Sequence, residues 1–175
     1  MHPLYKFRFC PVCGSDHFVP NSDKSKKCAD CGFEYFLNAS AANVAFILNA
    51  RRELLVVTRK KEPARGTLDL PGGFADIGET AEEGVMREVM EETGLEVTAL
   101  RYLFSLPNSY PYSGFEVKTL DSFYLCQVRH ADSARPHDDA ADLQWVALND
   151  LQPDLFGLAS IRAGLLRFLH DRPWL

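Results

Sequence analysis

The segment from residue 73 to residue 95, GFADIGETAEEGVMREVMEETGL, carries seven acidic side chains and one basic side chain, Arg87. Residues 80–93 have the pattern of a helix, with Val85 and Val89 on its buried face and Gly94 at the point where it stops. Like charges four residues apart on a helix repel each other. The chain must therefore fold so that something positive compensates these carboxylates.

Several of the acids are expected to converge. Glu88, Glu91 and Glu92 are spaced by three and four residues, so they share one face of the helix. Glu79 lies just before the helix and can fold back toward the same region. Because Mg2+ and Mn2+ prefer clustered oxygen ligands, the pattern indicates a cation site, with a solvated acidic face as the alternative. Arg87 is turned aside from the stripe and is better placed to hold a carboxylate than to bind substrate, unless it forms an ordinary surface ion pair.

Residues 1–37 form a distinct part of the chain with two CxxC-G motifs separated by fourteen residues. In each motif a tight turn lets two thiolates face one ion, and the glycine takes a backbone conformation that other residues resist. About thirty residues bury too little apolar surface to fold alone, so a structural zinc ion is expected to supply the folding free energy. This predicts a zinc ribbon over residues 1–37 and a second domain over residues 38–175, with zinc ligands Cys10, Cys13, Cys28 and Cys31.

The remaining composition is that of a globular protein. The chain has 175 residues, is 46% apolar and carries a net charge of -5, which gives no reason to expect general nucleic-acid affinity. No run approaches the roughly 18 apolar residues that span a bilayer, and the N-terminus lacks a leader pattern. We therefore expect a cytoplasmic protein without a membrane partner, in which Cys126 is a small core residue.

Short apolar runs rich in β-branched residues predict strands, and they are interrupted by two helical patterns. The second helix is expected after residue 150, with Leu158, Ile161 and Leu165 at helical spacing. Strands mixed with two helices imply a sheet that is covered by helices. The predicted strands are residues 43–48, 54–58, 67–70, 97–104, 122–128 and 143–148.

The acidic segment also resembles a known family. From Gly73 it runs through five residues to Glu79, through seven more to Arg87, and ends at Leu95. Position by position this is similar to the Nudix box, GX5EX7REUXEEXGU with U apolar, and all nine specified positions match. The resemblance covers about residues 40–170. It implies an α/β (α+β) Nudix fold, with a mixed sheet sandwiched between helices, and a hydrolase that cleaves a nucleoside diphosphate linked to another moiety.

The same resemblance implies roles for individual residues. Glu88, Glu91 and Glu92 carry over as ligands of Mg2+ or Mn2+, Glu79 as a supporting acid, and the Gly73 carbonyl as a further ligand. Physical chemistry agrees, because a cation neutralises diphosphate charge and lowers the pKa of an attacking water.

A carboxylate must also take the proton of that water. Glu91 or Glu92 is one candidate, and Asp139, six residues before Trp145, is another, since many Nudix enzymes place the base outside the box. Arg59, at the end of an apolar run, is a candidate for binding phosphates, with a solvated strand end as the alternative.

A zinc ribbon ahead of such a domain resembles the NADH pyrophosphatase group, which carries the motif SQPWPFPXS after the box. Residues 105–113 read SLPNSYPYS and agree at five of eight specified positions, counting Tyr110 as the aromatic. Asn108 stands at the tryptophan position, where a large stacking face is lost. The alternative is a proline-rich loop whose aromatics pack on the sheet. The substrate-binding candidates are Ser105, Tyr110, Tyr112 and Phe115.

Several functions stay open. NADH, NAD+ or a related dinucleotide is one substrate class, and ADP-ribose or a nucleoside triphosphate is the alternative. A different class is a Nudix-like sensor that binds nucleotides without hydrolysis, although such proteins tend to have broken boxes. The ribbon and its lysines also suggest an RNA-binding or decapping role, which the net charge disfavours. By analogy with related enzymes, a homodimer is expected.

Overall fold

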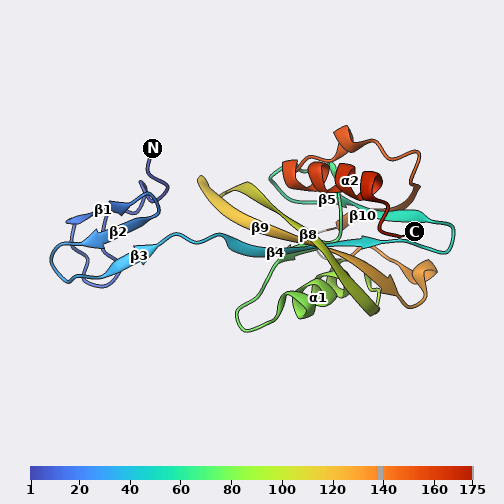
Figure 1. The fold of residues 1–175 in the computed structure, drawn as a ribbon, viewed down its shortest axis with the longest axis horizontal. Coiled ribbons are helices and arrows are strands. Elements are labelled where there is room, and N and C mark those ends of the chain that lie inside the picture. Colours follow the sequence, from blue (N-terminus) through green and yellow to red (C-terminus); the bar gives the residue numbers. More distant parts are fainter. Residues whose placement is uncertain (138–139, 175) are drawn as a thin grey trace. The chain divides into compact units, whose positions relative to one another are not determined.

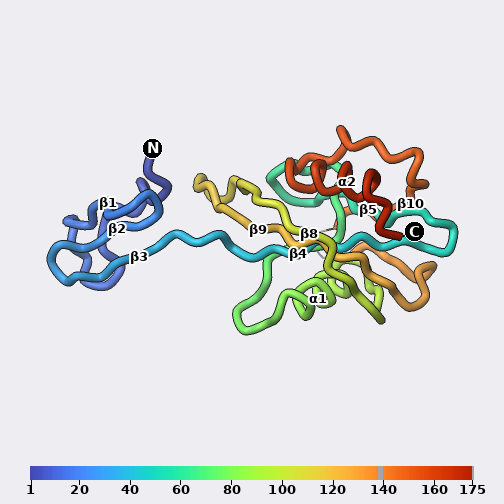
Figure 2. The backbone as a smooth tube through the Cα atoms, in the orientation of Figure 1, coloured from blue at the N-terminus to red at the C-terminus, as the bar shows by residue number. Residues whose placement is uncertain are grey.

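A computed structural model of the chain describes residues 1–137 and 140–174 (Figures 1 and 2). Packing divides the chain into two units. The first unit is Met1–Ala39 together with Tyr110–Lys118, and the second is Ser40–Ser109 together with Thr119–Leu175. Within the described residues, none of the helices has the length and apolar character that crossing a membrane requires.

The first unit is built on a three-stranded antiparallel sheet that the sequence pattern did not predict. Its strands are β1 (Phe18–Ser22), β2 (Ser25–Cys28) and β3 (Glu34–Phe36), in that order. Gly14 and Gly32 follow the two CxxC motifs with φ of 77° and 78°, a region that favours glycine. Their N–H groups donate to the carbonyls of Cys10 and Cys28 at 2.9 and 3.0 Å. The two motifs therefore form matching turns.

The tip of a long hairpin also belongs to the first unit. The hairpin consists of β8 (Val97–Tyr112) and β9 (Phe115–Val128). At its tip, the Phe115 ring lies 5.6 Å from the Phe7 ring in an edge-on arrangement, and Lys6 donates to the Gly114 carbonyl. The proline-rich loop that was the alternative for residues 105–113 is wrong for residues 105–112, because β8 continues through them. Its prolines are tolerated because β8 is the edge strand of its sheet.

The second unit contains two sheets. The first is mixed, in the order β7-β4-β9-β8, and the second has the order β10-β5-β6. β4 pairs parallel with β9 and antiparallel with β7. The elements not yet delimited are β4 (Ser40–Ile47), β5 (Glu53–Arg59), β6 (Leu68–Asp69), β7 (Gly72–Phe74), β10 (Ala140–Ala147), helices α1 (Ala81–Thr93) and α2 (Ala159–Asp171), and 3-10 helices Ala131–Ser133 and Pro153–Leu155.

The two helices cover opposite faces of the strands, as Figure 1 shows. Successive side chains of a strand point to opposite faces. On β4, Phe46 packs in the cluster that contains Leu165 of α2, whereas Ile47 packs in the cluster that contains Val85 of α1. Both clusters are fully buried at these positions. The expected layering, with a mixed sheet between helices, is confirmed.

A buried polar network joins the hairpin to α2. Asp121 of β9 is 4% exposed. Its carboxylate accepts hydrogen bonds from Asn108 Nδ2 at 3.2 Å, from Thr119 Oγ1 at 2.5 Å and from Ser160 Oγ at 2.5 Å. Leu158, the N-cap residue of α2, has no side-chain acceptor to offer. Asp121 therefore brings negative charge to the first turn of α2 from a neighbouring strand.

Replacing Asp121 with alanine should destabilise the fold by about 3 kcal/mol, because two buried hydroxyl groups and the half-buried Asn108 amide lose their acceptor. Urea unfolding would measure this change. Asp154→Ala is the matched control, since the Asp154 side chain is 97% exposed and its loss should cost less than about 0.5 kcal/mol. Equal unfolding midpoints for the two variants would show that the network contributes nothing.

Candidate active site

The ends of α1 are fixed by its own sequence. Thr80 Oγ1 accepts from the Glu83 N–H at 3.1 Å, and the Glu83 carboxylate accepts from the Thr80 N–H at 2.7 Å, which forms a capping box. At the other end Gly94 adopts φ of 69° and its N–H donates to the Met90 carbonyl at 2.9 Å. The register of the helix is therefore set, and with it the face that the acids occupy.

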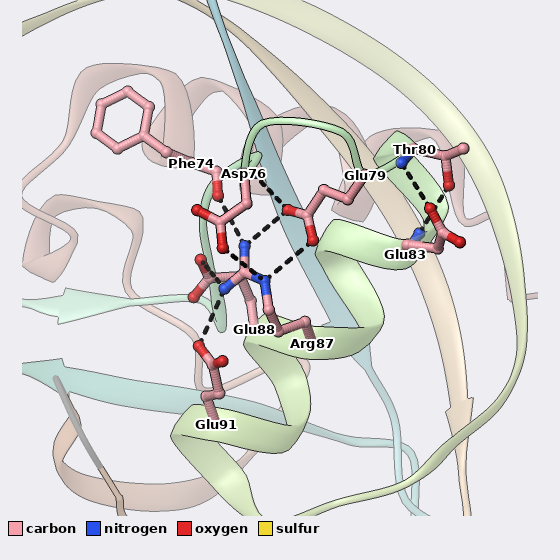
Figure 3. Close-up of polar contacts among 8 residues, drawn as sticks. All are labelled: Phe74, Asp76, Glu79, Thr80, Glu83, Arg87, Glu88 and Glu91. Atoms are coloured by element: carbon pink, nitrogen blue, oxygen red, sulfur yellow. Dashed lines mark hydrogen bonds and ion pairs between the residues drawn. The ribbon is translucent and has the colours of Figure 1, made fainter.

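Arg87 lies at the centre of the acidic cluster, as Figure 3 shows. Its Nε and Nη2 donate to the two oxygens of Glu79 at 3.0 and 2.8 Å. Its Nη1 donates to Glu88 and to Glu91, both at 3.0 Å. Nη2 also donates to the Phe74 carbonyl at 3.0 Å. All five guanidinium N–H groups are thus used, and this guanidinium is the positive charge that compensates three carboxylates.

The pKa values of two acids in the cluster are shifted in opposite directions. The guanidinium of Arg87, followed by the Asp76 N–H, lowers the pKa of Glu79 to about 2. Burial raises the pKa of Glu88 above its usual range, although Arg87 opposes this effect. Hydrogen bonding to Glu79 raises the pKa of Arg87. Glu79 is therefore a permanent anion, whereas Glu88 is a desolvated carboxylate that gains from a nearby positive charge.

The Gly72-Gly73 turn lets backbone approach the cluster closely. A Cβ on Gly73 would lie 2.5 Å from Glu88 Oε1, so any side chain there would displace that carboxylate. A Cβ on Gly72 would lie 2.1 Å from the Asn43 carbonyl oxygen of the neighbouring strand. The turn therefore needs glycine at both positions for β7, β4 and Glu88 to lie this close together.

Glu92 has a different neighbour from the other box acids. It is 8% exposed, and its Oε2 accepts from the Gly72 N–H at 3.1 Å. The structure thus brings Glu79, Glu88 and Glu91 together around Arg87 and ties Glu92 to the glycine turn.

The residues present fit a hard divalent cation. They offer carboxylate oxygens on one helix face beside a glycine that leaves Glu88 its space. The same carboxylates are shared through Arg87, so a cation bound by Glu88 or Glu91 would compete with the guanidinium for them. The metal roles of these residues and the orienting role of Arg87 stay predictions.

The two candidates outside the box have different outcomes. Asp139 lies outside the described residues. Arg59, at the end of β5, forms an ion pair with the buried Asp69 and donates from Nε to the Pro63 carbonyl at 2.8 Å. Burial raises the pKa of Asp69, and Arg59 opposes that rise. Arg59 is therefore part of a buried ion pair, and its role with phosphates stays a prediction.

The substrate-binding candidates are divided between the two units. Ser105 is half-buried on β8 in the second unit. Tyr110 and Tyr112 belong to the first unit and stack on each other at 6.4 Å between ring centroids. Phe115 contacts Phe7 in that unit. The substrate roles of these four residues stay predictions.

Sequence reasoning missed Asn43, Asp76 and the Phe74 carbonyl. Asp76 lies 3.5 Å from Arg87 and its N–H donates to Glu79 at 2.6 Å. Asn43 is 1% exposed on β4, and leaving a buried polar group unpaired costs about 1–3 kcal/mol. The signal for Asn43 was an asparagine within an apolar β-rich run, since asparagine is depleted in strands.

The four cysteines of the first unit form a second candidate site. One sulfur from each of Cys10, Cys13, Cys28 and Cys31 lies within 4.8 Å of the others. Cys10 and Cys28 are buried beside Phe18, while the other two are exposed. The sulfurs are thus placed to hold one metal ion, as the sequence predicted for this cluster.

Comparison with curated proteins finds similar relatives. The chain is 28% identical over 153 residues to the NAD-capped RNA hydrolase NudC of Vibrio vulnificus, which covers 87% of this chain and 55% of that protein. The chain therefore spans about half the length of the curated relatives that it matches.

Solved structures share the fold. A NUDIX hydrolase from Nitrosomonas europaea matches with a TM-score of 0.72 and 19% identity, over 94% of this chain and 92% of that one. The NUDIX domain of Shewanella oneidensis NrtR, complexed with ADP ribose, matches with a TM-score of 0.62 and 21% identity, over 78% and 90%. The family model described as NUDIX domain matches residues 37–168. The chain belongs to the NUDIX family.

Proposed function

We propose that this protein hydrolyses the diphosphate bond of a nucleoside diphosphate linked to another moiety, with Mg2+ or Mn2+ as cofactor. The observation that carries the proposal is the set of carboxylates that Arg87 holds beside the Gly72-Gly73 turn. A structural acid cluster would not need a glycine to leave room for a desolvated glutamate. An intact box in a NUDIX family member supports the same activity and disfavours a non-catalytic sensor.

A bound divalent cation supplies charge neutralisation of the phosphates and lowers the pKa of an attacking water. Glu88, Glu91 and Glu92 would hold it, with the Gly73 carbonyl as a further ligand. Arg87 orients Glu88 and Glu91, and Glu79 anchors the guanidinium from its other edge. Glu91 or Glu92 takes the proton of the water, with Asp139 as the alternative base.

NADH, NAD+ or a related dinucleotide is the substrate class that we favour. The support is the similarity to NudC of Vibrio vulnificus, whose name describes hydrolysis of NAD-capped RNA. ADP-ribose is the second candidate, because it is the ligand of the Shewanella oneidensis NUDIX domain. Both molecules contain a diphosphate linked to adenosine, so the same carboxylates serve either. Nucleoside triphosphates, and RNA binding or decapping, are the remaining alternatives.

A substrate panel tests the proposal. NADH, NAD+, ADP-ribose, dinucleoside polyphosphates, nucleoside triphosphates and NAD-capped RNA would each be incubated with Mg2+ or Mn2+, and products would be separated by chromatography. We expect cation-dependent release of AMP from NADH or NAD+. Exclusive cleavage of triphosphates would contradict the substrate class, and no cation-dependent cleavage of any member would contradict the enzyme.

Replacing Glu91 with glutamine should lower turnover at least about a hundredfold, since an amide is a poor ligand for a hard cation. The fold should survive, because the Glu91 side chain is 46% exposed and such ion pairs contribute little to stability. Glu82→Gln is the matched control, as an exposed acid in the first turn of the same helix. Turnover would be compared with the thermal midpoint of each variant. Full activity in Glu91→Gln would remove that residue from the site.

We also infer that the cysteine cluster binds zinc, and that the ribbon is a structural module. Four thiolates leave no open coordination position for a reactive water. Cys10→Ser should therefore lose zinc and lower the thermal midpoint without changing Mn2+ binding. Elemental analysis by mass spectrometry would measure the zinc. Cys126→Ala is the control, since this buried thiol lies in the core beside α1 and should leave zinc bound. Unchanged zinc content in Cys10→Ser would refute the ribbon site.

A cytoplasmic location and a homodimer complete the proposal. None of the five cysteines forms a disulfide among the described residues. Cysteines without disulfides, four of them proposed to hold a metal ion, suit a reducing compartment. The proposed domains remain residues 1–37 and 38–175.

A further inference from the structure

Asn43 carries a side-chain amide that is buried without a partner. Its side chain lies on β4 and is 1% exposed. Within the described residues, both Nδ2 and Oδ1 lack a hydrogen-bond partner. Buried amides are almost always paired, because desolvation without a hydrogen bond costs free energy of folding. An unpaired amide at this depth indicates a role beyond packing within the sheet.

The amide faces the candidate active site. In the sheet Asn43 pairs with Gly73, the glycine whose Cβ would collide with Glu88. From the helix side it meets Gly84 of α1. A Cβ on Gly84 would lie 2.6 Å from Asn43 Nδ2 and 2.8 Å from Glu79 Oε1. The amide nitrogen and the carboxylate oxygen thus border the same small space, which glycine leaves open.

The glycine itself needs an explanation. Gly84 lies inside a regular helix, where glycine is less favourable than alanine. It is buried, and its φ is not in the left-handed region that would demand glycine. The close approach of Asn43 and Glu79 accounts for it, since an alanine methyl group would separate them.

We propose that Asn43 is a positioning residue for the cation site and that its amide N–H donates to the Glu79 carboxylate when the cation is bound. The proposal rests on the proposed function and adds a residue outside the box to it. Rotation of either side chain into the space beside Gly84 forms the hydrogen bond. Asn43 acts through Glu79 and has no direct contact with substrate or cation.

The charge distribution around Arg87 explains why the hydrogen bond from Asn43 to Glu79 is needed when the cation is bound. In this structure the guanidinium is shared among Glu79, Glu88 and Glu91. When Glu88 and Glu91 turn to a cation, Glu79 is the carboxylate that still holds Arg87 through two hydrogen bonds, together with the Phe74 carbonyl. Glu79 already accepts from Arg87 and from the Asp76 N–H, and a further donor from β4 would fix that carboxylate from another side, and through it the guanidinium. Asn43 therefore acts on the cation site through Glu79.

Two substitutions test this with Mn2+ alone as the probe. Asn43→Leu keeps most of the side-chain volume, and Asn43→Ala removes most of it. Both substitutions remove the amide. Free Mn2+ would be followed by electron paramagnetic resonance in zinc-loaded protein without substrate. We expect the Mn2+ dissociation constant to be roughly tenfold higher in both variants. Asn43→Leu should also keep or raise the thermal midpoint measured without Mn2+, because it removes an unpaired buried amide.

Val44→Ala is the matched control on the same strand. Val44 is 4% exposed and packs in the cluster beside α2, on the opposite face of β4. Its truncation should lower the thermal midpoint and leave Mn2+ affinity unchanged, which is the reverse of the pattern expected for Asn43→Leu. A lower midpoint with unchanged Mn2+ affinity in Asn43→Leu would assign Asn43 a structural role and overturn the proposal.

Gly84→Ala approaches the same contact from the helix. Its methyl group would lie 2.8 Å from Glu79 Oε1 as well as beside Asn43, so it should weaken Mn2+ binding in the wild-type background and cause a smaller further loss once Asn43 is alanine. Equal losses in both backgrounds would show that the two residues act independently and would refute the proposed contact.

Failure of the proposed function gives a different result. If wild-type protein binds no Mn2+, or if Glu91→Gln binds it as wild type does, the cation site itself is wrong and the proposal for Asn43 falls with it. If wild-type protein and both Asn43 variants bind Mn2+ within about twofold of one another, the cation site stands and only the role of Asn43 is overturned.

Discussion

The guanidinium of Arg87 is the interaction on which the candidate site depends. A helix with so many acids on one side would repel itself, and its first-turn acids are offset only by the helix dipole and by the capping box of Glu83. Arg87 resolves the repulsion by placing one fixed fork of five donors among three carboxylates and a backbone carbonyl. It ties the loop before α1, the helix and the end of β7 to one point. Because the three carboxylates share one guanidinium, a change of charge at Glu88 or Glu91 alters the interaction between Arg87 and Glu79.

Three buried polar groups of the second unit differ in how completely they are paired. Asp121 has three donors, and Asp69 has Arg59 and the Leu70 N–H. Both carboxylates therefore have hydrogen-bond donors within the folded chain. Asn43 is buried as deeply and is unpaired at both ends. A paired network is explained by the folded state alone, whereas an unpaired amide beside a carboxylate cluster is explained by a second state of that cluster.

The sequence predicted the parts of the site that depend on local geometry. Helical spacing alone placed Glu88 and Glu91 on one side of α1, and the position of Glu79 just before the helix predicted that it folds back toward the same region. Glu92 was expected on the same stripe, but its partner is the Gly72 N–H, twenty residues earlier in the chain. Contacts of this kind depend on how a strand docks against a helix, which periodicity does not encode. The same limit hid Asn43, whose neighbours Gly73 and Gly84 are distant in sequence. The length of β8 was missed because its prolines were taken as loop signals and not as features of an edge strand.

Asn108 shows how a local departure from a motif is absorbed by the fold. It stands where the resembled motif has tryptophan, and its amide donates to the buried Asp121 at 3.2 Å. A tryptophan there would add a stacking face, but it would also take one donor from a carboxylate that holds Ser160 at the start of α2. A substitution at this position therefore alters the anchoring of α2 together with any stacking face that it introduces. A change in specificity caused by Asn108→Trp has to be separated from a change in stability, and Thr119→Val, which removes a different donor from the same carboxylate, provides that separation.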